Sequence, residues 1–493
     1  MNDQKKTKLS RRDFVAKSAV TLGGISILPS TVIAGLGHKA PSDKLNIAGV
    51  GVGGRGLSVL NAMNKENIVG LCDVDWHYSE KAFKTYPKAK RYKDFRKMLD
   101  EMKDIDAVMV ATPDHTHALV AATAMMMGKH VYVEKPLTLS VSEARVLTNM
   151  AKEYKVATQM GNQGNSGEGV RSICEWIWSG KIGEVKEVKA WTNRPIWPQG
   201  LERPKGTPQP PSTLDWDLFL GPAKYRPYNP IYTPWNWRAW WDFGTGALGD
   251  MGCHILDPVV QALRLKYATS VEASSTQLNT ESAPLASTIH FEFPKREKFG
   301  KVKMPELKVT WTDGGILPER PAEMLESERF DPSGGVIFEG TKGKIVCGCY
   351  GKNPMLLPSS EMDKFKRPKQ TLRRIDQGHY MDWVRACKED PSSRVEASSN
   401  FENAGPLTEM VLMGNLGLRL QSLKKKLLWD GDNMRFTNIS DSEQIKVVTS
   451  DHFEVVNGHP IFDTKYATQN ALEAAAGYVK PKYRKGWEIK PFA

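Results

Sequence analysis

A glycine-rich turn near residue 50 constrains the fold of this chain more than any other sequence feature. It follows Leu45–Val50, a short apolar run of the kind that forms a buried parallel strand. Residues 57–63 come next, with apolar side chains at helical spacing. The turn matches G-x-G-x-x-G and reads Gly51, Val52, Gly53, Gly54, Arg55 and Gly56. Such glycines let a pyrophosphate approach the N–H donors at a helix start, so the turn predicts a dinucleotide site.

A second apolar run ends in an acidic residue at the spacing that such a site requires. Residues 68–72 form the run, and Asp73 follows it about 20 residues after the turn. A carboxylate at this place binds the ribose hydroxyls of the adenosine and repels the 2′-phosphate of NADP. The combination predicts NAD as the cofactor, with NADP less favoured, although Arg55 could weaken that preference.

Strand-like and helix-like runs continue to alternate as far as about residue 165. Residues 105–111 and 130–133 are apolar runs, and each is followed by a polar cluster. The first cluster begins at Thr112 and Pro113 and ends at His117, and the second is Glu134-Lys135-Pro136. Ligands of a doubly wound sheet bind at the carboxyl ends of its strands. We therefore predict an α/β protein that starts with a Rossmann doubly wound parallel sheet over residues 43–165.

The sequence changes character from about residue 164. Trp- and Pro-rich segments are followed by alternating runs at residues 185–191, 287–293 and 307–311. Alternation predicts half-exposed strands, and hence a C-terminal α+β domain with a large, mostly antiparallel open sheet over residues 166–430. We expect this domain to bind substrate and to form a homo-oligomer through its sheet. Residues 431–493 are predicted to be an extension that packs on the body.

Asp250 and His254 lie four residues apart in a segment that predicts a helix from about Ala247. Residues at i and i+4 share one helix face. Neutral histidine accepts a proton near physiological pH, and a carboxylate can orient it, which is the equipment for alcohol oxidation. A capped helix with a buried core histidine explains the same spacing equally well, so the residues alone leave both interpretations open.

A dense aromatic segment, Trp235–Asp242, precedes the predicted helix. Aromatic faces stack on the C–H surfaces of sugars, while arginine binds their hydroxyls. We predict a carbohydrate-binding cleft with Arg194, Trp240 and Trp241 as candidate substrate contacts. A subdomain core or an oligomer interface explains any individual tryptophan about as well.

Residues 1–40 resemble a twin-arginine export signal. Arg11 and Arg12 precede an apolar run, residues 19–28, that is too short and too rich in glycine to span a bilayer. This predicts recognition by the twin-arginine machinery, a periplasmic or otherwise exported protein, and no stable membrane anchor. An ordinary amphipathic N-terminal helix is the alternative.

The net charge of +12 does not indicate a nucleic-acid partner. Residues 1–40 hold seven Lys or Arg and two Asp or Glu, so they contribute +5 and the remainder carries only +7. No basic stretch alternates with stacking aromatic residues, so no nucleic-acid binding is expected. His115, His117 and His130 have no carboxylate or thiolate cluster beside them in the sequence, and we expect no metal site.

From about Asn46 to Asp430, the chain resembles the Gfo/Idh/MocA family of NAD(P)-dependent oxidoreductases, named for glucose–fructose oxidoreductase and inositol dehydrogenase. The resemblance rests on the glycine turn, the Thr-Pro-x-x-x-His stretch that ends at His117, and the E-K-P motif at Glu134. It implies a set of cofactor-binding residues: Gly51, Gly53, Gly54, Arg55, Gly56, Asp73, Thr112, Pro113, His117, Glu134, Lys135 and Asn162.

The resemblance also implies a catalytic set, Lys135, Asp250 and His254. In this family the E-K-P lysine stands beside the nicotinamide and the reacting hydroxyl, and a D-x-x-x-H helix carries the catalytic Asp and His. His254 would take the hydroxyl proton, Lys135 would polarise the oxygen, and Asp250 would orient the substrate or His254. We therefore expect an enzyme, an exported dehydrogenase that transfers a hydride between a sugar or glycoside carbon and tightly bound NAD.

Two other functions remain open on the same fold. One is an NAD-dependent glycoside hydrolase that acts through transient oxidation; relatives that resemble the N-acetylgalactosaminidase branch usually lack the E-K-P lysine, which is present here as Lys135. The other is a non-catalytic sugar-sensing protein, against which the intact set Lys135, Asp250 and His254 argues.

Overall fold

A parallel six-stranded sheet forms the first half of this computed structural model, which describes residues 43–492. The strand order is β3-β2-β1-β4-β5-β6, so the order reverses between β1 and β4, where a doubly wound sheet binds its ligand. The strands are β1 (Asn46–Val50), β2 (Asn67–Cys72), β3 (Lys90–Tyr92), β4 (Ala107–Val110), β5 (His130–Val133) and β6 (Thr158–Met160). The predicted Rossmann sheet is confirmed.

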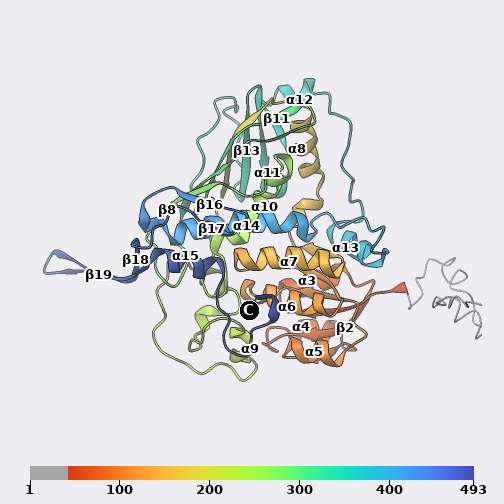
Figure 1. Cartoon of the computed structure of the whole chain (residues 1–493), viewed down its shortest axis with the longest axis vertical. Helices are drawn as coiled ribbons and strands as arrows, with labels where there is room; N and C mark the ends of the chain where they lie inside the picture. The colour runs from red at the N-terminus through yellow and green to blue at the C-terminus, as the bar shows by residue number, and fades with distance from the viewer. Residues whose placement is uncertain (1–42, 493) are drawn as a thin grey trace, which may run out of the picture. The chain divides into compact units, whose positions relative to one another are not determined.

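Helices connect these strands and cover the sheet (Figure 1). The start of α7 shows why the chain turns helical there, because Ser140 and Glu143 form a capping box that satisfies backbone N–H groups at the helix N-terminus. The connecting helices are α3 (Arg55–Ala62), α4 (Glu80–Thr85), α5 (Phe95–Glu101), α6 (Asp114–Met126) and α7 (Val141–Tyr154).

A nine-stranded sheet forms the second half, in the order β15-β14-β13-β7-β12-β9-β8-β16-β17. Only β7 and β12 pair in parallel among its neighbouring strands, so the predicted, mostly antiparallel sheet is confirmed. Buried and half-exposed residues alternate along β9, as the sequence predicts. Its strands are β7 (Val185–Thr192), β8 (Ser270–Ser275), β9 (Ser287–Phe293), β12 (Leu307–Thr312), β13 (Gly334–Gly340), β14 (Gly343–Gly348), β15 (Met355–Leu357), β16 (Leu427–Asp430) and β17 (Arg435–Phe436). A separate ribbon pairs β10 (Arg296–Phe299) with β11 (Val302–Met304).

Helix α14 (Phe401–Arg419) lies between the two sheets and packs on α7 as well as on β8 and β9 (Figure 1). It also positions α10 (Gly246–Ile255), which carries Asp250 and His254. A Cβ at Gly252 would lie 2.8 Å from Val411, and one at Gly414 would lie 2.4 Å from Leu248, so glycine lets the two helices approach closely. The other helices of this half are α8 (Glu168–Trp178), α9 (Trp216–Leu220), α11 (Asp257–Ala262), α12 (Glu361–Lys364) and α13 (His379–Lys388).

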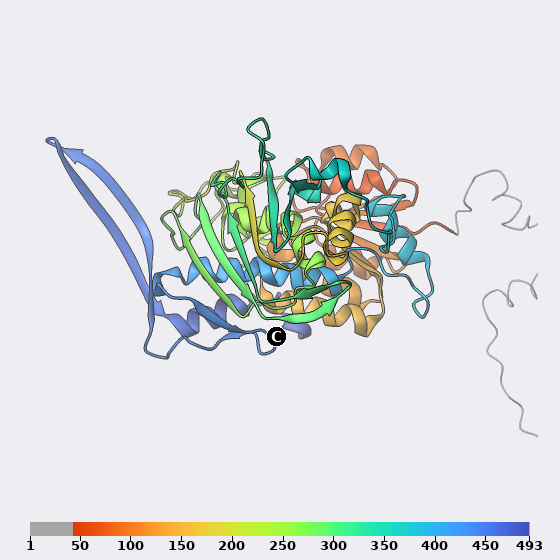
Figure 2. The same ribbon diagram turned by 90° about the horizontal axis from the view of Figure 1, so that it is seen from above.

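The C-terminal extension divides into a projecting hairpin and a packed tail. Strands β18 (Gln444–Val456) and β19 (His459–Asn470) pair with each other, and the outer part of the hairpin projects from the body (Figure 2). The base of the hairpin packs on the body, because Val448 bridges Asn279 and Ile445 is buried. Near the tip, Phe453 and Phe462 are 58% and 73% exposed, so the prediction that this whole extension packs on the body is wrong for the outer part of the hairpin. Helix α15 (Ala471–Val479) returns to the body and buries its alanine face.

The export signal and the homo-oligomer both stay predictions. Residues 1–40, with the twin-arginine pattern, lie outside the described residues. Association through the open sheet stays a prediction; half-buried ion pairs such as Lys189–Glu339, at 2.8 Å, lie on its strands. Across residues 43–492, no helix has the length and apolar character needed to cross a membrane.

Candidate active site

The glycine turn has a backbone that only glycine fits. Gly51 has a φ of 76°, and a Cβ there would lie 2.7 Å from the backbone of Ala111. A Cβ at Gly56 would lie 1.9 Å from the carbonyl oxygen of Gly51. The turn therefore packs against the end of β4 and leads directly into the N-terminus of α3, which no side chain caps.

Asp73 stands at the end of β2 and shapes this turn. Its Oδ2 accepts hydrogen bonds from the backbone N–H groups of Val52 and Gly53, at 2.9 and 3.0 Å. Its Oδ1 accepts one from the N–H of Asp75, at 3.0 Å. Burial raises the pKa of Asp73 to about 6, against the opposing effect of these three N–H groups. The carboxylate thus fixes the turn and also lines the cavity beside it.

That cavity, which we call the dinucleotide cavity, extends from the glycine turn along the ends of β2 and β4. Of the predicted cofactor-binding residues, it brings together Gly51, Gly53, Arg55, Asp73, Thr112 and Pro113. Gly54 and Gly56 are not in its wall. Gly56 serves the turn, and Gly54, with a φ of 47°, is the residue before α3.

A second cavity, which we call the reaction cavity, continues from the first. The two share wall residues, among them Arg55, Thr112 and Arg238. Its wall holds the predicted residues Thr112, His117, Glu134, Lys135, Arg194, Asp250 and His254. The carboxyl ends of β4 and β5 therefore meet α10 in one hollow beside the dinucleotide cavity.

Lys135 and Asp250 form a close ion pair in the reaction cavity. The Lys135 Nζ donates to Asp250 Oδ1 and to the Asp250 backbone carbonyl, both at 2.7 Å, and Arg238 Nε donates to the same Oδ1 at 3.3 Å. Burial alone would raise the pKa of Asp250, but the charges of Lys135 and Arg238 outweigh it and hold that pKa at about 2. Asp250 thus holds Lys135 in place, and the prediction that it orients the substrate or His254 stays a prediction.

His254 lies one helical turn further along α10, and its ring is 4.5 Å from the ring of Tyr350. Its Nδ1 has no hydrogen-bond partner among the described residues. Burial, reinforced by the charge of Lys135, lowers the pKa of His254 well below its ordinary value. The imidazole is therefore neutral at physiological pH, the form that accepts a proton.

Arg55 is directed toward the reaction cavity. Its Nε donates to Glu134 Oε1 at 3.0 Å, and its Nη2 donates to the hydroxyl of Tyr380 at 2.8 Å. Because Glu134 and Tyr380 engage the guanidinium, Arg55 is not committed to a 2′-phosphate beside Asp73. Arg55 also lines the dinucleotide cavity, so its effect on the preference for NAD over NADP stays a prediction.

The paired histidines of α6 face backbone carbonyls. The His117 ring nitrogens lie 2.8 Å from the Pro136 carbonyl and 2.9 Å from the Thr112 carbonyl, so this ring ties β4 to the E-K-P segment. His115 Nε2 donates to the carbonyl of Phe219 at 2.9 Å. Within residues 43–492, no three His, Cys, Asp or Glu side chains group as a metal site.

Asp114 is a cavity residue that the sequence analysis missed. It is the first residue of α6, and Thr245 Oγ1 donates to its Oδ2 at 2.6 Å. Burial raises the pKa of Asp114 to about 7, although Thr245 and the charge of Lys135 oppose that shift. Its place directly after Thr112 and Pro113, at the carboxyl end of β4, was the available signal.

Asn162 is not in the wall of either cavity, which corrects the prediction that it contacts the cofactor. It is fully buried, and its Oδ1 accepts a hydrogen bond from Ser399 Oγ at 2.5 Å. Its neighbour Gln163 lines the reaction cavity instead. The backbone turn after β6 therefore places the side chain of Gln163, and not that of Asn162, in the wall of the reaction cavity.

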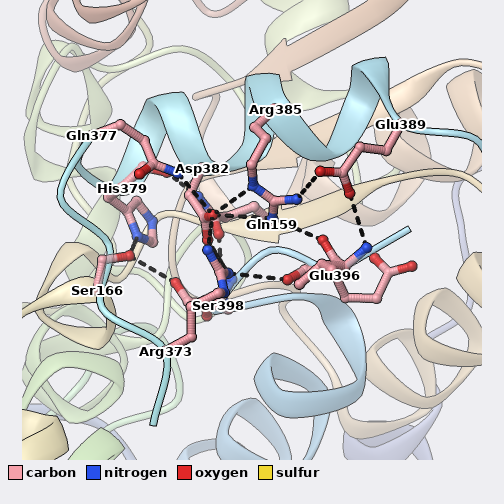
Figure 3. Close-up of polar contacts among 12 residues, drawn as sticks. Gln159, Ser166, Arg373, Gln377, His379, Asp382, Arg385, Glu389, Glu396 and Ser398 are labelled. Atoms are coloured by element: carbon pink, nitrogen blue, oxygen red, sulfur yellow. Dashed lines mark hydrogen bonds and ion pairs between the residues drawn. The ribbon is translucent and has the colours of Figure 1, made fainter. Parts of the chain in front are cut away.

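A polar network anchors the segment after β6 to α13 (Figure 3). His379 Nδ1 lies 2.7 Å from Ser166 Oγ, while its Nε2 donates to the carbonyl of Met160 at 2.9 Å. Asp382 instead binds Arg373 through two hydrogen bonds of 2.6 and 2.9 Å. Because no carboxylate orients His379, the serine and histidine here do not form a hydrolase triad.

The predicted substrate contacts Trp240 and Trp241 are wrong. Trp240 is fully buried and packs edge-on against Tyr232, with ring centroids 4.8 Å apart. Trp241 is also buried, below the guanidinium of Arg419. Neither lines the dinucleotide cavity or the reaction cavity.

Trp235 and Trp237, two other tryptophans of the same segment, line the cavities instead of Trp240 and Trp241. Both line the dinucleotide and reaction cavities, and the guanidinium of Arg238 lies 4.0 Å from one ring centroid and 4.3 Å from the other. Arg194 does line the reaction cavity, as predicted, and donates to Asn193 Oδ1 at 2.6 Å.

A Rossmann domain whose dinucleotide cavity adjoins a cavity lined by acid–base residues of both domains is typical of nicotinamide-dependent oxidoreductases. Comparison with protein families places the chain within that class. Residues 45–162 match the model for the Gfo/Idh/MocA oxidoreductase family, NAD-binding Rossmann fold, and residues 178–295 match that family's C-terminal alpha/beta domain. The chain therefore contains both domains of the Gfo/Idh/MocA oxidoreductases.

Individual relatives are more distant. The chain is 30% identical over 170 residues to glycosyl hydrolase family 109 protein 1 of Akkermansia muciniphila, which covers 32% of this chain and 35% of the relative. It is 30% identical over 145 residues to inositol 2-dehydrogenase of Salmonella typhimurium, covering 29% and 43%. The matches thus span about a third to a half of these curated relatives.

A solved structure shows the same fold. The WlbA dehydrogenase of Bordetella pertussis, in complex with NADH and UDP-GlcNAcA, superposes with a TM-score of 0.53 at 14% identity. The superposition covers 78% of this chain and 99% of that one. The two-domain architecture is therefore shared along nearly all of that dehydrogenase.

Proposed function

We propose that this protein is an NAD-dependent dehydrogenase that transfers a hydride between a sugar or glycoside hydroxyl carbon and its nicotinamide cofactor. One observation carries the proposal, the convergence of Lys135, Asp250 and His254 in a cavity that continues the dinucleotide cavity. A histidine with a purely structural role in the core would not be expected to lie beside a charged lysine in the wall of a cavity. The inositol 2-dehydrogenase and WlbA relatives support a polyol or sugar substrate.

The residues present fit NAD. The turn at Gly51 and Gly56 has no room for a Cβ, and Thr112 Oγ1 is buried without a partner among the described residues. The glycine turn would let the pyrophosphate approach the start of α3, and Asp73 would bind the adenosine ribose. When bound, NAD supplies the acceptor for the hydride. The protein's task is to position the carbon and to manage the hydroxyl proton.

Proton removal falls to His254, which is neutral because burial lowers its pKa. Lys135 donates a hydrogen bond to the same substrate oxygen and stabilises the charge that develops there. Asp250 Oδ1 accepts a hydrogen bond from Lys135 Nζ at 2.7 Å and so fixes the position of the ammonium group. Acid–base groups act only when they lie within hydrogen-bond distance of the reacting hydroxyl. A substrate bound in the reaction cavity would meet this condition for both His254 and Lys135.

Trp235, Trp237 and Arg194 support a carbohydrate as the substrate. The two tryptophans supply aromatic surface to the cavity wall, and Arg194 supplies hydrogen-bond donors. The aromatic rings can stack on the C–H faces of a pyranose, while Arg194 can donate hydrogen bonds to its hydroxyls.

A glycoside hydrolase that acts through transient oxidation is the second candidate, favoured by the likeness to glycosyl hydrolase family 109 protein 1. Incubation of the purified protein with simple glucosides separates the possibilities. A keto-sugar product supports the dehydrogenase, and released aglycone supports the hydrolase. Formation of neither, with sugar binding intact, would overturn both and leave a sensing protein.

Asp73→Ala is expected to weaken NAD binding by about tenfold or more and to relax discrimination against NADP. The ribose loses its acceptor, the 2′-phosphate loses its repulsion, and the turn loses the hydrogen bonds to Val52 and Gly53. Titration of both cofactors by fluorescence measures the effect. Unchanged affinities for both would place the ribose contact elsewhere.

Export through the twin-arginine route is part of the proposal. The route carries folded cargo, so the protein could bind NAD in the cytoplasm before it crosses the membrane. Replacement of Arg11 and Arg12 with lysine is expected to strand the protein in the cytoplasm, as judged by cell fractionation. Normal export of that double variant would contradict the route.

A further inference from the structure

The dinucleotide cavity has a wall that the Rossmann domain does not supply. Besides Asp73, its lining includes Leu218 and Phe219 from α9 and Trp487 from the C-terminal tail, and none of these residues lines the reaction cavity. The Rossmann domain contributes Phe95 and Val120, which line this cavity and not the reaction cavity. Two segments that are remote in sequence from the glycine turn thus close an apolar compartment next to the ribose-binding carboxylate.

Backbone and side-chain contacts fix the tail that carries Trp487. Arg484 donates from its backbone N–H to the carbonyl of Pro222 at 2.9 Å and from Nε to the carbonyl of Gly221 at 3.0 Å. The backbone N–H of Trp487 donates to the backbone carbonyl of Arg484 at 3.0 Å. Tyr483 donates its hydroxyl to Glu143 Oε1 at 2.6 Å, which ties the tail to α7. The tail is thus held on α7 and on the turn after α9.

The Trp487 ring is built into the wall. It is only 7% exposed, and the guanidinium of Arg96 lies 4.1 Å from the centroid of its ring. Arg96 is held in turn by Asp94, which it contacts at 2.7 Å. A cation over an indole is a favourable contact, and here it fixes the orientation of a large aromatic surface at the edge of the cavity.

The chemistry of this compartment suits the adenine ring. Asp73 marks the ribose, so the base lies beyond it, on the side away from the reaction cavity. Apolar side chains and an aromatic ring offer a flat, weakly polar base the stacking and dispersion contacts that it favours. The nicotinamide half lies in the opposite direction, toward Lys135 and His254.

We propose that Trp487 is an adenine-binding residue and that the tail, residues 480–492, clasps the adenosine half of the dinucleotide. The inference rests on the proposed function, because it takes the cofactor to be NAD. Because the clasp lies across the adenosine compartment, the dinucleotide is released only when the tail detaches from α9 and α7. The cofactor then stays bound through many turnovers.

The test measures the release of NADH from the full-length holoprotein. The protein is loaded with NADH, mixed with excess NAD, and followed by the loss of NADH fluorescence. Trp487→Ala is expected to release NADH about 10- to 100-fold faster than the wild type, the effect of losing a buried aromatic anchor. Trp487→Phe keeps an aromatic ring and is expected to lie between the two.

Two further variants separate the clasp from simple unfolding. Lys485→Ala alters an exposed tail residue next to the Arg484 anchor and is expected to release NADH at the wild-type rate. Arg484→Ala leaves Trp487 in place but removes the anchor on Gly221 and Asp217, and is expected to accelerate release. Thermal unfolding of each holoprotein shows that the variants compared are folded.

The outcomes distinguish this inference from the function on which it rests. Release at the wild-type rate from both Trp487→Ala and Arg484→Ala would overturn the clasp and leave the proposed dehydrogenase standing. A wild-type protein that binds no NADH would overturn the proposed cofactor, and the clasp with it.

Discussion

His254→Ala is expected to lower turnover by about 10²- to 10⁴-fold while the protein stays folded and keeps its dinucleotide, because a positioned acid–base group is worth that much. The Nδ1 of His254 has no partner among the described residues, so the substitution strands no buried hydrogen-bonding group. The ring also lies in the wall of the reaction cavity rather than in the closed core. Sugar-dependent reduction of NAD, bound dinucleotide and thermal unfolding are measured on the same preparation.

The pH profile gives a second readout. Because burial and Lys135 lower the pKa of His254, its base form persists below pH 6.5, the ordinary histidine value. Acidification inactivates the base only when the pH falls through the lowered pKa. The acid limb of kcat/KM attributable to His254 is therefore expected below pH 6.5 and absent from the alanine variant.

His115 provides a matched control. It is also buried on a helix, but it lines neither cavity; it contacts the Phe219 carbonyl and packs between Phe219 and Phe243. His115→Ala is expected to lower the melting temperature while activity per folded molecule is kept. The same behaviour from His254→Ala, destabilised but fully active, would sink the proposed mechanism and leave the Rossmann fold untouched.

The features that were predictable from sequence are local ones. Gly51, Gly56 and Asp73 lie within one strand–turn–helix–strand unit, so their spacing along the chain already reflects their spacing in space. The parallel sheet follows from the alternation of apolar runs with helical runs. The same reasoning predicted that Lys135 stands at a strand end, although only the family resemblance connected it to His254.

The aromatic segment shows where such reasoning stops. Trp235 to Trp241 lies in a short 3-10 helix and turns, where no regular period assigns alternate residues to a wall or a core. Composition predicts aromatic surface near the site, and Trp235 and Trp237 supply it. Which of the neighbouring indoles turns inward is decided by packing against Tyr232, a contact that composition does not encode.

Trp487 was missed for a different reason. Its partners Arg96 and Phe219 are more than 260 residues away in the sequence, and nothing near the C-terminus suggests a dinucleotide. Why Gln163 lines the reaction cavity and Asn162 does not is equally non-local, because the Asn162 side chain is hydrogen-bonded by the distant Ser399. Long-range contacts of this kind come only from the assembled fold.

Lys135→Ala is expected to lower turnover by about 10²- to 10³-fold, in the range measured for removal of one donor to a developing oxyanion. It also leaves the Asp250 carboxylate buried with Arg238 as its remaining partner, at 3.3 Å. The pKa of Asp250 is then expected to rise, because the charge of Lys135 is a main cause of its low value. Stability at neutral pH is expected to fall with it, since a less well compensated buried charge is costly.

Lys189→Ala is the control for loss of an ion pair alone. Lys189 pairs with Glu339 at the same distance scale, 2.8 Å, on half-exposed strands of the nine-stranded sheet. A pair of this kind is worth about 1 kcal/mol or less. Turnover is expected to be unchanged in this variant.

The double variant Lys135→Ala/His254→Ala decides whether the two groups act on one oxygen. Groups that share a transition-state contact lose less together than the sum of their separate losses. The combined loss is therefore expected to exceed that of His254→Ala by much less than the full effect of Lys135→Ala. Strict additivity of the two losses would mean that Lys135 acts independently of the proton transfer. Its role would then be confined to holding Asp250 and the wall of the cavity.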